Sequence, residues 1–222
     1  MNSYENGVES TPAQLSELVN LIHSFSSVRR YSNKSLIKDE NIAEHSSIVG
    51  IITLYLYDRL HHEDRPLVDI NKVLAASIFH DFDEIFTGDI LNPVKYYDRS
   101  IKEKVNEYAD LCISKFGETT NFNSLVKYTS SSFLTDAEHC LMKLADIISV
   151  FIKFRIENGL GNKLLNVDYK NIIGVLNSHQ YKSLFRNSHE LREVCDLIVK
   201  ISLELDDKDT PYSNIMNFPI RG

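Results

Sequence analysis

Apolar residues recur at the three- and four-residue spacing of an α-helix along most of this chain. Leu15, Leu18 and Ile22, for example, fall on one face of a first helical segment that begins near Pro12. The spacing predicts helices over about residues 12–25, 41–60, 69–80, 100–116, 136–157 and 188–205. No alternating strand pattern of useful length appears. The expected fold class is therefore all-α.

Capping and helix-breaking residues agree with these boundaries. Asn41 followed by Glu44 has the form of a capping box, and Asp69 and Asp136 are suited to cap the helices that follow them. Gly88 and Pro93 predict a loop. The chain is expected to form a single helical domain over residues 1–222, with a core from about 12 to 205 and a loosely held tail at 206–222.

Composition and charge narrow the function. The 222 residues are 43% hydrophobic, and the formal net charge is −7. A nucleic-acid polymer is an unsuitable partner because its phosphate backbone needs a basic surface, whereas a small phosphorylated substrate needs only a local cation. We expect no signal peptide and no membrane partner, since the longest apolar runs are too short to span a bilayer. The three cysteines form no CxxC pair, so we expect reduced thiols and a cytoplasmic protein.

Two imidazoles and two carboxylates lie on helices whose apolar composition predicts burial. His80 and Asp81 are adjacent near the end of an apolar helix, His45 lies one turn into the helix before it, and Asp146 lies in the middle of a long apolar helix. Such groups are expensive to bury unless they are paired or bind a metal. A mixed nitrogen and oxygen set suits Mn, Co, Fe or Zn.

The residues around these positions resemble one known family. The chain is similar to the HD superfamily of phosphohydrolases, and within it to the bacterial 5′-deoxynucleotidase branch. The similarity covers about residues 30–162. The matching segments are Asn41–Ser46, His80–Glu84, Thr87–Asp89, Pro93–Tyr96, Leu144–Asp146 and Gly161–Asn162.

The resemblance implies a role for each matched residue. His45, His80, Asp81 and Asp146 correspond to the four ligands of one divalent transition metal, expected to be Co, Mn or Zn, with Fe and Mg as alternatives. Further matches are Glu84 for proton transfer, Asp89 for contact with the sugar or orientation of water, and Arg30 for binding phosphate. The family also implies a homodimer.

Tyr31 is a departure from the family pattern. The relatives carry a Trp that abuts the sugar and disfavours the 2′-hydroxyl, whereas Tyr31 is smaller and has its own hydroxyl. The resemblance therefore implies hydrolysis more directly than selectivity for deoxyribose. Lys95 is expected to add positive charge near the phosphate.

Other interpretations of these residues stay open at this level. Arg30 is able to pair with Glu40, Asp89 to cap the turn after Gly88, and Glu84 to be an ordinary surface carboxylate. The leading function is hydrolysis of deoxyribonucleoside 5′-monophosphates to deoxyribonucleoside and orthophosphate. One alternative is a deoxynucleoside triphosphohydrolase that releases triphosphate, and another is a nucleotide-binding regulator without turnover.

Overall fold

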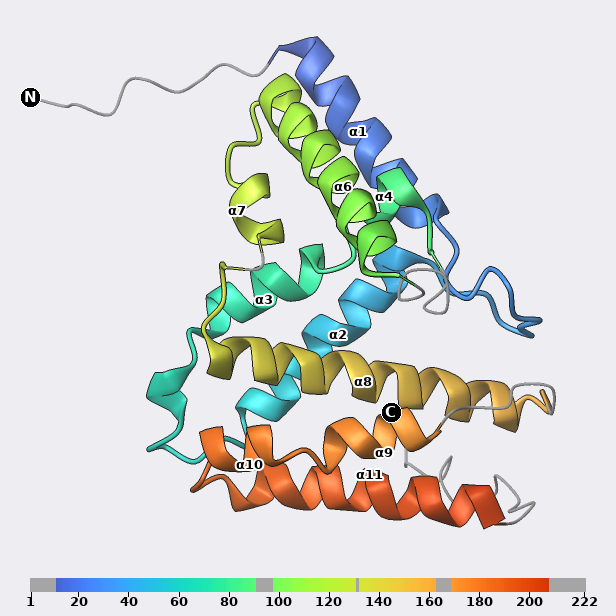
Figure 1. Cartoon of the computed structure of the whole chain (residues 1–222), viewed down its shortest axis with the longest axis vertical. Coiled ribbons are helices and arrows are strands. Elements are labelled where there is room, and N and C mark those ends of the chain that lie inside the picture. The colour runs from blue at the N-terminus through green and yellow to red at the C-terminus, as the bar shows by residue number, and fades with distance from the viewer. Residues whose placement is uncertain (1–10, 91–97, 131, 163–168, 208–222) are drawn as a thin grey trace, which may run out of the picture. The chain divides into compact units, whose positions relative to one another are not determined.

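The computed structural model describes residues 11–90, 98–130, 132–162 and 169–207, and within these ranges it contains helices and no strand (Figure 1). The predicted all-α class is therefore confirmed. The elements, labelled as in Figure 1, are α1 (Pro12–Ser27), α2 (Ile42–Tyr57), the 3₁₀ helix η1 (Arg65–Leu67), α3 (Ile70–Phe79), α4 (Glu84–Thr87), α6 (Arg99–Thr120), α7 (Leu125–Thr129), α8 (Asp136–Gly159), α9 (Tyr169–Leu176), α10 (His179–Leu184) and α11 (His189–Asp207).

The predicted capping box at the start of α2 is confirmed. The Glu44 amide donates to Asn41 Oδ1 over 2.9 Å, and the Asn41 amide donates to Glu44 Oε2 over 3.3 Å. At α8 the predicted cap is wrong by one residue, because Thr135 forms the box with Glu138 and Asp136 is the first helical residue. A Thr hydroxyl followed by Glu at the third position satisfies two helix-terminal amides, which Asp136 alone cannot do.

Contacts group the chain into two compact units. Unit 1 holds the described residues within 1–33, 40–46 and 78–133, and unit 2 holds those within 34–39, 47–77 and 134–222. The boundary cuts through α2 and α3, so neither unit is a separate stretch of sequence. The expectation of a single domain stays a prediction, and the 208–222 part of the expected tail lies outside the described residues.

Unit 1 is built around a small aromatic core. Leu21 of α1, Phe82, Ile113 of α6 and Leu125 of α7 are its buried members. The Phe82 ring contacts Phe79, Phe86, Phe25 and Phe116, with ring centroids 5.6–6.4 Å apart. Because Phe82 directly follows Asp81, this packing fixes the backbone immediately after the predicted metal ligands.

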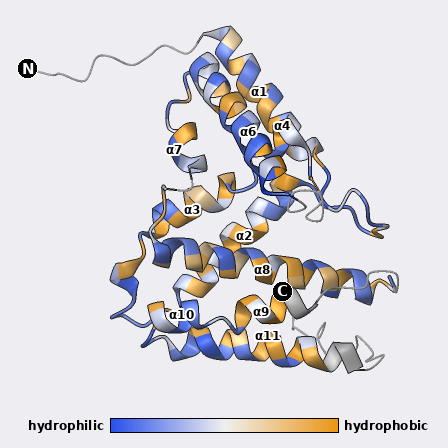
Figure 2. Ribbon diagram, in the orientation of Figure 1, coloured by the Kyte–Doolittle hydropathy of each residue, from blue (hydrophilic) through white to orange (hydrophobic). Residues whose placement is uncertain are grey.

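Unit 2 has the larger core, arranged around α8. Leu141, Leu144 and Ile148 of α8 pack in one cluster with buried residues of α2, α9, α10 and α11. Figure 2 shows the short helix α9 as one of the most hydrophobic segments, in keeping with its place against α8 and α11. The sequence did not predict α9 or α10, because each is shorter than the stretch of about 11 residues over which helical periodicity can be recognised.

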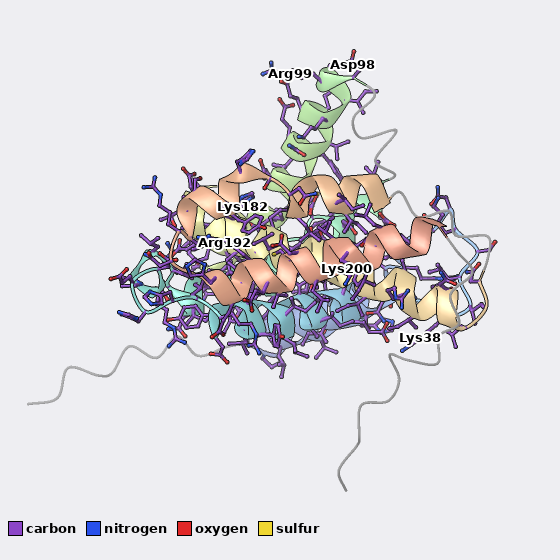
Figure 3. The ribbon with its side chains drawn as sticks, turned by 90° about the horizontal axis from the view of Figure 1, so that it is seen from below. Lys38, Asp98, Arg99, Lys182, Arg192 and Lys200 are labelled. Atoms are coloured by element: carbon purple, nitrogen blue, oxygen red, sulfur yellow. The ribbon has the colours of Figure 1, made fainter. Side chains whose placement is uncertain are left out.

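Charged residues mark the solvent-exposed ends and faces of the helices. Asp98 caps α6 by accepting from the Ser100 amide over 2.7 Å, and Arg99 pairs with Glu103 one turn later (Figure 3). Arg192 of α11, labelled in Figure 3, donates to the Phe185 carbonyl just after α10 over 3.3 Å. Among the described residues, no helix combines the length and hydrophobicity needed to cross a membrane.

A buried carboxylate at the end of α8 anchors a segment of unit 2 that is distant in sequence. Glu157 is fully buried, and its side chain accepts from the amides of Ile37 (2.8 Å) and Lys38 (2.9 Å). It also accepts from Asn162 Nδ2 over 2.8 Å and pairs with Lys153 Nζ over 3.2 Å. Burial alone would raise the pKa of Glu157, but these hydrogen bonds outweigh it and lower the pKa to about 2.

This lowered pKa predicts a pH-dependent contribution to stability. The folded-state pKa of Glu157 is about 2 against an ordinary value of 4.5, so the unfolded chain takes up the proton first as the pH falls. The contribution is present in full above about pH 4.5 and is lost as the pH drops towards 2.

Chemical unfolding of wild-type protein and of Glu157→Gln between about pH 2 and 6 measures this contribution to the free energy of unfolding. We expect the difference in free energy of unfolding to be largest above pH 4.5 and to shrink in acid. Glu103→Gln, at an exposed position of α6, is the control and should show no such trend. A difference that is constant with pH would contradict the assignment.

Candidate metal centre

Three of the predicted metal ligands come together within unit 1. His45 lies in the first turn of α2, held in place by the capping box, and His80 and Asp81 directly follow the last residue of α3. The Nε2 atoms of His45 and His80 are 3.1 Å apart. Asp81 Oδ2 is 3.3 Å from His80 Nε2 and 3.5 Å from His45 Nε2. Ligand atoms of all three residues thus lie within 4.8 Å of one another.

These separations fit ligands that share one metal ion. With bonds of about 2.1 Å, two neighbouring ligand atoms lie about 3.0 Å apart in octahedral geometry and about 3.4 Å apart in tetrahedral geometry. The three measured distances fall close to this range. In addition, His45 is only 1% exposed, and its Nε2 atom faces His80 Nε2 and Asp81 Oδ2. His45, His80 and Asp81 therefore form a donor set that could hold a divalent cation.

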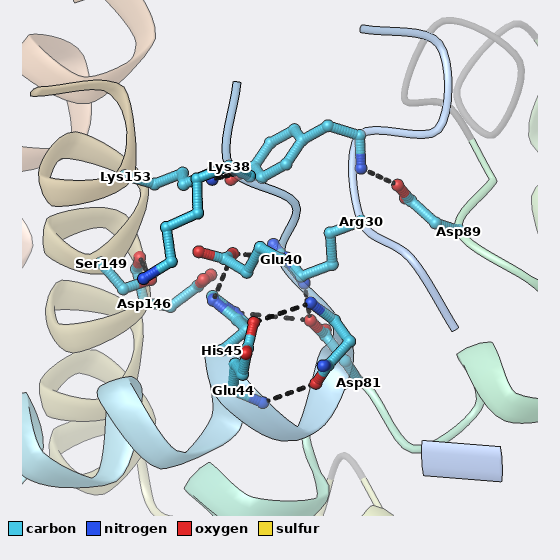
Figure 4. Close-up of polar contacts among 12 residues, drawn as sticks. Arg30, Lys38, Glu40, Glu44, His45, Asp81, Asp89, Asp146, Ser149 and Lys153 are labelled. Atoms are coloured by element: carbon cyan, nitrogen blue, oxygen red, sulfur yellow. Dashed lines mark hydrogen bonds and ion pairs between the residues drawn. The ribbon is translucent and has the colours of Figure 1, made fainter. Parts of the chain in front are cut away.

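Arg30 lies at the edge of this cluster and contacts two carboxylates. Its guanidinium donates to Asp81 Oδ2, and its Nε is 3.4 Å from Glu40 Oε1 (Figure 4). Glu40 Oε1 is also 3.8 Å from His45 Nδ1. Arg30 thus pairs with Glu40, an alternative that the sequence left open, and it also contacts Asp81 of the candidate ligand set. The contact between Glu40 and His45 was not predicted, because a Glu before a helix cap carries no sequence signal of its own.

Tyr31 and Asp89 are coupled through the backbone. Tyr31 has φ +57°, in the left-handed region that non-glycine residues rarely adopt, and its amide donates to Asp89 Oδ2 over 2.6 Å. Asp89 follows Gly88, whose φ of +72° allows the turn. The carboxylate therefore stabilises a strained residue next to Arg30, and the guanidinium carbon of Arg30 is 5.4 Å from the centroid of the Tyr31 ring.

Glu84 begins α4, three residues after Asp81, and it is partly buried. Burial and the charge of Asp81 raise the pKa of Glu84 to about 8, although Arg30 acts in the opposite direction. A carboxyl group in this state is able to carry a proton near neutral pH. Glu84 is therefore not an ordinary surface carboxylate.

Two further predicted site residues are Asp146 and Lys95. Asp146 belongs to unit 2, on α8, where Lys143 Nζ is 2.6 Å from its Oδ2 and its backbone carbonyl accepts from the Ser149 hydroxyl. Lys95 lies outside the described residues.

Solved structures of other proteins share this arrangement of helices. A crystal structure of an HD-domain phosphohydrolase from Listeria innocua superposes with a TM-score of 0.54 at 20% identity, covering 86% of each chain. The PH0347 protein from Pyrococcus horikoshii gives a TM-score of 0.58 at 21% identity, covering 84% of this chain and 99% of that one. The fold is therefore that of the HD-domain phosphohydrolases.

Sequence comparison places the chain more narrowly. It belongs to the 5′-deoxynucleotidase YfbR-like family, whose model matches residues 17–194. One relative, a 5′-deoxynucleotidase from Shewanella oneidensis, is 24% identical over 68% of this chain and 80% of its own length. The chain is accordingly a hydrolase of the HD phosphohydrolase class, as its motifs predict.

Proposed function

We propose that this protein is a metal-dependent phosphomonoesterase that hydrolyses deoxyribonucleoside 5′-monophosphates to deoxyribonucleoside and orthophosphate. The observation that carries the proposal is the close grouping of His45, His80 and Asp81 with Arg30 at its edge. A cation site beside a guanidinium is what a phosphate monoester needs, because both supply positive charge to the same dianion. Family membership and the named relatives support the choice of a 5′-deoxynucleotide.

We propose that His45, His80, Asp81 and Asp146 hold the metal, one divalent ion expected to be Co, Mn or Zn. When bound, such an ion polarises the phosphoryl oxygen and makes a water molecule more acidic. The Glu40 carboxylate, 3.8 Å from His45 Nδ1, favours a proton on that nitrogen, which leaves Nε2 for coordination. The resemblance of the residues around Asp146 to the family motif supports including it in the set.

The remaining residues act on the substrate. Arg30 binds two phosphate oxygens through its forked guanidinium and stabilises the charge that develops during hydrolysis. Glu84, with its raised pKa, exchanges a proton with the attacking water or the leaving 5′-oxygen. Tyr31 lies against the sugar, and Asp89 holds Tyr31 in position.

The test is to remove metal from the purified protein and reload it separately with Co, Mn, Zn and Mg. Each form is assayed with dAMP, AMP and dATP for orthophosphate and tripolyphosphate, beside the variant Asp146→Ala. We expect orthophosphate from dAMP, released faster than from AMP, and no product without metal or from the variant.

Other outcomes would overturn parts of the proposal. Tripolyphosphate from dATP with dAMP untouched would reassign the substrate and keep the metal site. An Asp146→Ala variant with wild-type activity and wild-type metal affinity would remove Asp146 from the ligand set. Tight nucleotide binding with metal bound but without product would indicate a regulator.

A cytoplasmic homodimer remains a proposal that rests on the cysteine pattern and on the family resemblance. Light scattering at several protein concentrations measures the assembly state. A mass of one chain at every concentration would contradict it.

A further inference from the structure

The loop of residues 31–39 lies between Arg30 and Glu40, whose backbone atoms are hydrogen-bonded to each other. At its base, in unit 1, the Arg30 amide donates to the Glu40 carbonyl over 2.9 Å, and Arg29 and Asn41 form an isolated antiparallel bridge. These contacts join the two ends of the loop, next to Arg30 and Tyr31. The further part of the loop, residues 34–39, belongs to unit 2.

The loop has little packing of its own to order it. None of its side chains is fully buried: seven of the nine are exposed, among them Ile37 at 56%, and Tyr31 and Leu36 are half-buried. Burial of apolar surface therefore contributes little to fixing its conformation, although fixing each residue costs about 1–2 kcal/mol of backbone entropy. Polar contacts must supply the order.

Those contacts converge on Glu157. Its carboxylate accepts from the backbone amides of Ile37 and Lys38, and Lys153 Nζ bridges the carboxylate and the Lys38 carbonyl (Figure 4 draws this last contact). Asn162 Nδ2 donates to both Glu157 Oε2 and the Ser35 carbonyl, over 2.8 and 2.7 Å. Glu157, Lys153 and Asn162 together form what we call the loop clamp.

The clamp is built by the way α8 ends. The Asn162 amide donates to the Glu157 carbonyl over 3.0 Å, and the Gly161 amide donates to the Asn158 carbonyl over 3.0 Å, which is the Schellman pattern of a helix C-terminus. Gly161 has φ +91°, as that pattern requires. The turn brings Asn162 back to Glu157, while Lys153 lies one helical turn before it. Lys153 and Asn162 thus hold the Glu157 carboxylate in addition to its contacts with the loop.

We propose that Glu157 is a positioning residue for the phosphate- and sugar-binding side of the site, acting through the 31–39 loop on Arg30 and Tyr31. The inference rests on the proposed function, since it concerns how the substrate is held. The hydrogen bonds of the Glu157 side chain go to the loop, to Lys153 and to Asn162, so any effect on substrate binding is transmitted through the loop. By ordering the loop it reduces the freedom of the backbone at both ends, so that Arg30 and Tyr31 are held in a binding geometry before the substrate arrives.

The experiment compares Glu157→Gln and Asn162→Ala with a matched control, Asp64→Asn. Asp64 is also a buried carboxylate of unit 2, and it accepts from the Asn187 amide and the Ser188 hydroxyl. Its partners lie far along the chain from the 31–39 loop. All three variants lose hydrogen bonds to a buried polar group, so they are expected to lose stability to a similar degree. Only the first two alter the clamp. Asn162→Ala leaves the carboxylate intact and serves if Glu157→Gln does not fold.

Four measurements are made on the full chain loaded with cobalt. They are the steady-state kinetics with dAMP, which give KM and kcat, the ratio of kcat/KM for dAMP and AMP, the cobalt dissociation constant, and hydrogen exchange at the amides of Ile37 and Lys38. In the clamp variants we expect exchange at least about tenfold faster and kcat/KM about ten- to a hundredfold lower, mainly through KM. The dAMP preference should fall, and cobalt affinity should stay within about twofold. In Asp64→Asn all four should match wild type.

Other results would overturn the inference. Faster exchange with an unchanged KM and unchanged dAMP preference would make the clamp purely structural. An equal loss of kcat/KM in Asp64→Asn would indicate general destabilisation, and weakened cobalt binding would assign the effect to the metal cluster. An active wild type that is insensitive to Glu157→Gln and Asn162→Ala overturns this inference alone. A wild type that neither binds nor hydrolyses any nucleotide overturns the proposed function and this inference with it.

Discussion

Replacing Asp81 with Asn is expected to lower kcat/KM for the nucleotide substrate by about a thousandfold or more. Asp81 supplies the only carboxylate among the three clustered side chains in unit 1, and its Oδ2 lies 3.3 and 3.5 Å from the two histidine nitrogens. An amide keeps the shape but removes the charge that offsets a divalent cation. The loss of metal-assisted charge stabilisation is worth several kcal/mol, and about 4 kcal/mol corresponds to a thousandfold.

Two measurements separate this effect from misfolding. Metal titration should show weaker cobalt binding by Asp81→Asn, while the thermal midpoint without metal should stay close to wild type, because Arg30 retains Glu40 as a partner. Asp98→Asn is the matched control. This exposed cap of α6 has no place in the proposed site, so the variant's kcat/KM should be that of wild type. Retention of wild-type activity by Asp81→Asn would refute the proposed metal centre.

Replacing Arg30 with Ala is expected to lower kcat/KM by about a hundred- to a thousandfold, the cost of removing one donor to a developing charge. The guanidinium already sits between Asp81 and Glu40, so it is oriented at the edge of the metal cluster before substrate binds. Arg30→Lys should recover only part of the loss, because an ammonium group cannot make the forked contact with two phosphate oxygens.

Steady-state kinetics with dAMP provides the measurement, and Arg29→Ala is the control. Arg29 is adjacent and exposed, and its bridge to Asn41 is made by backbone atoms, so the variant should keep wild-type kcat/KM. Cobalt affinity should be little changed in either variant, since Arg30 is not a ligand. If Arg30→Ala and Arg29→Ala had the same activity, Arg30 would only balance the charge of its carboxylate neighbours.

The sequence alone determined the helical class and the capping box at Asn41, and it indicated the residue types of the candidate site. These follow from local rules, because helical periodicity and a cap depend on residues three or four positions apart. The residue types of His45, His80 and Asp81 were recognisable as a ligand set, and the motifs around them indicated the family. The short helices α7, α9 and α10 were missed, since segments of this length are decided by packing and not by period.

Only the tertiary structure decided which groups surround those residues. The apolar stripe of α1 predicts a buried face, yet Leu15 and Ile22 are 59% and 62% exposed and the helix packs through Leu21 and Phe25 instead. Three further contacts also have no local signal in the sequence. Glu40 contacts His45 and Arg30. Asp89 accepts from the Tyr31 amide, and Glu157 accepts from the amides of Ile37 and Lys38. Each joins a side chain to a partner whose identity is set by how the backbone folds, because a buried carboxylate accepts from whichever donors the fold brings within reach.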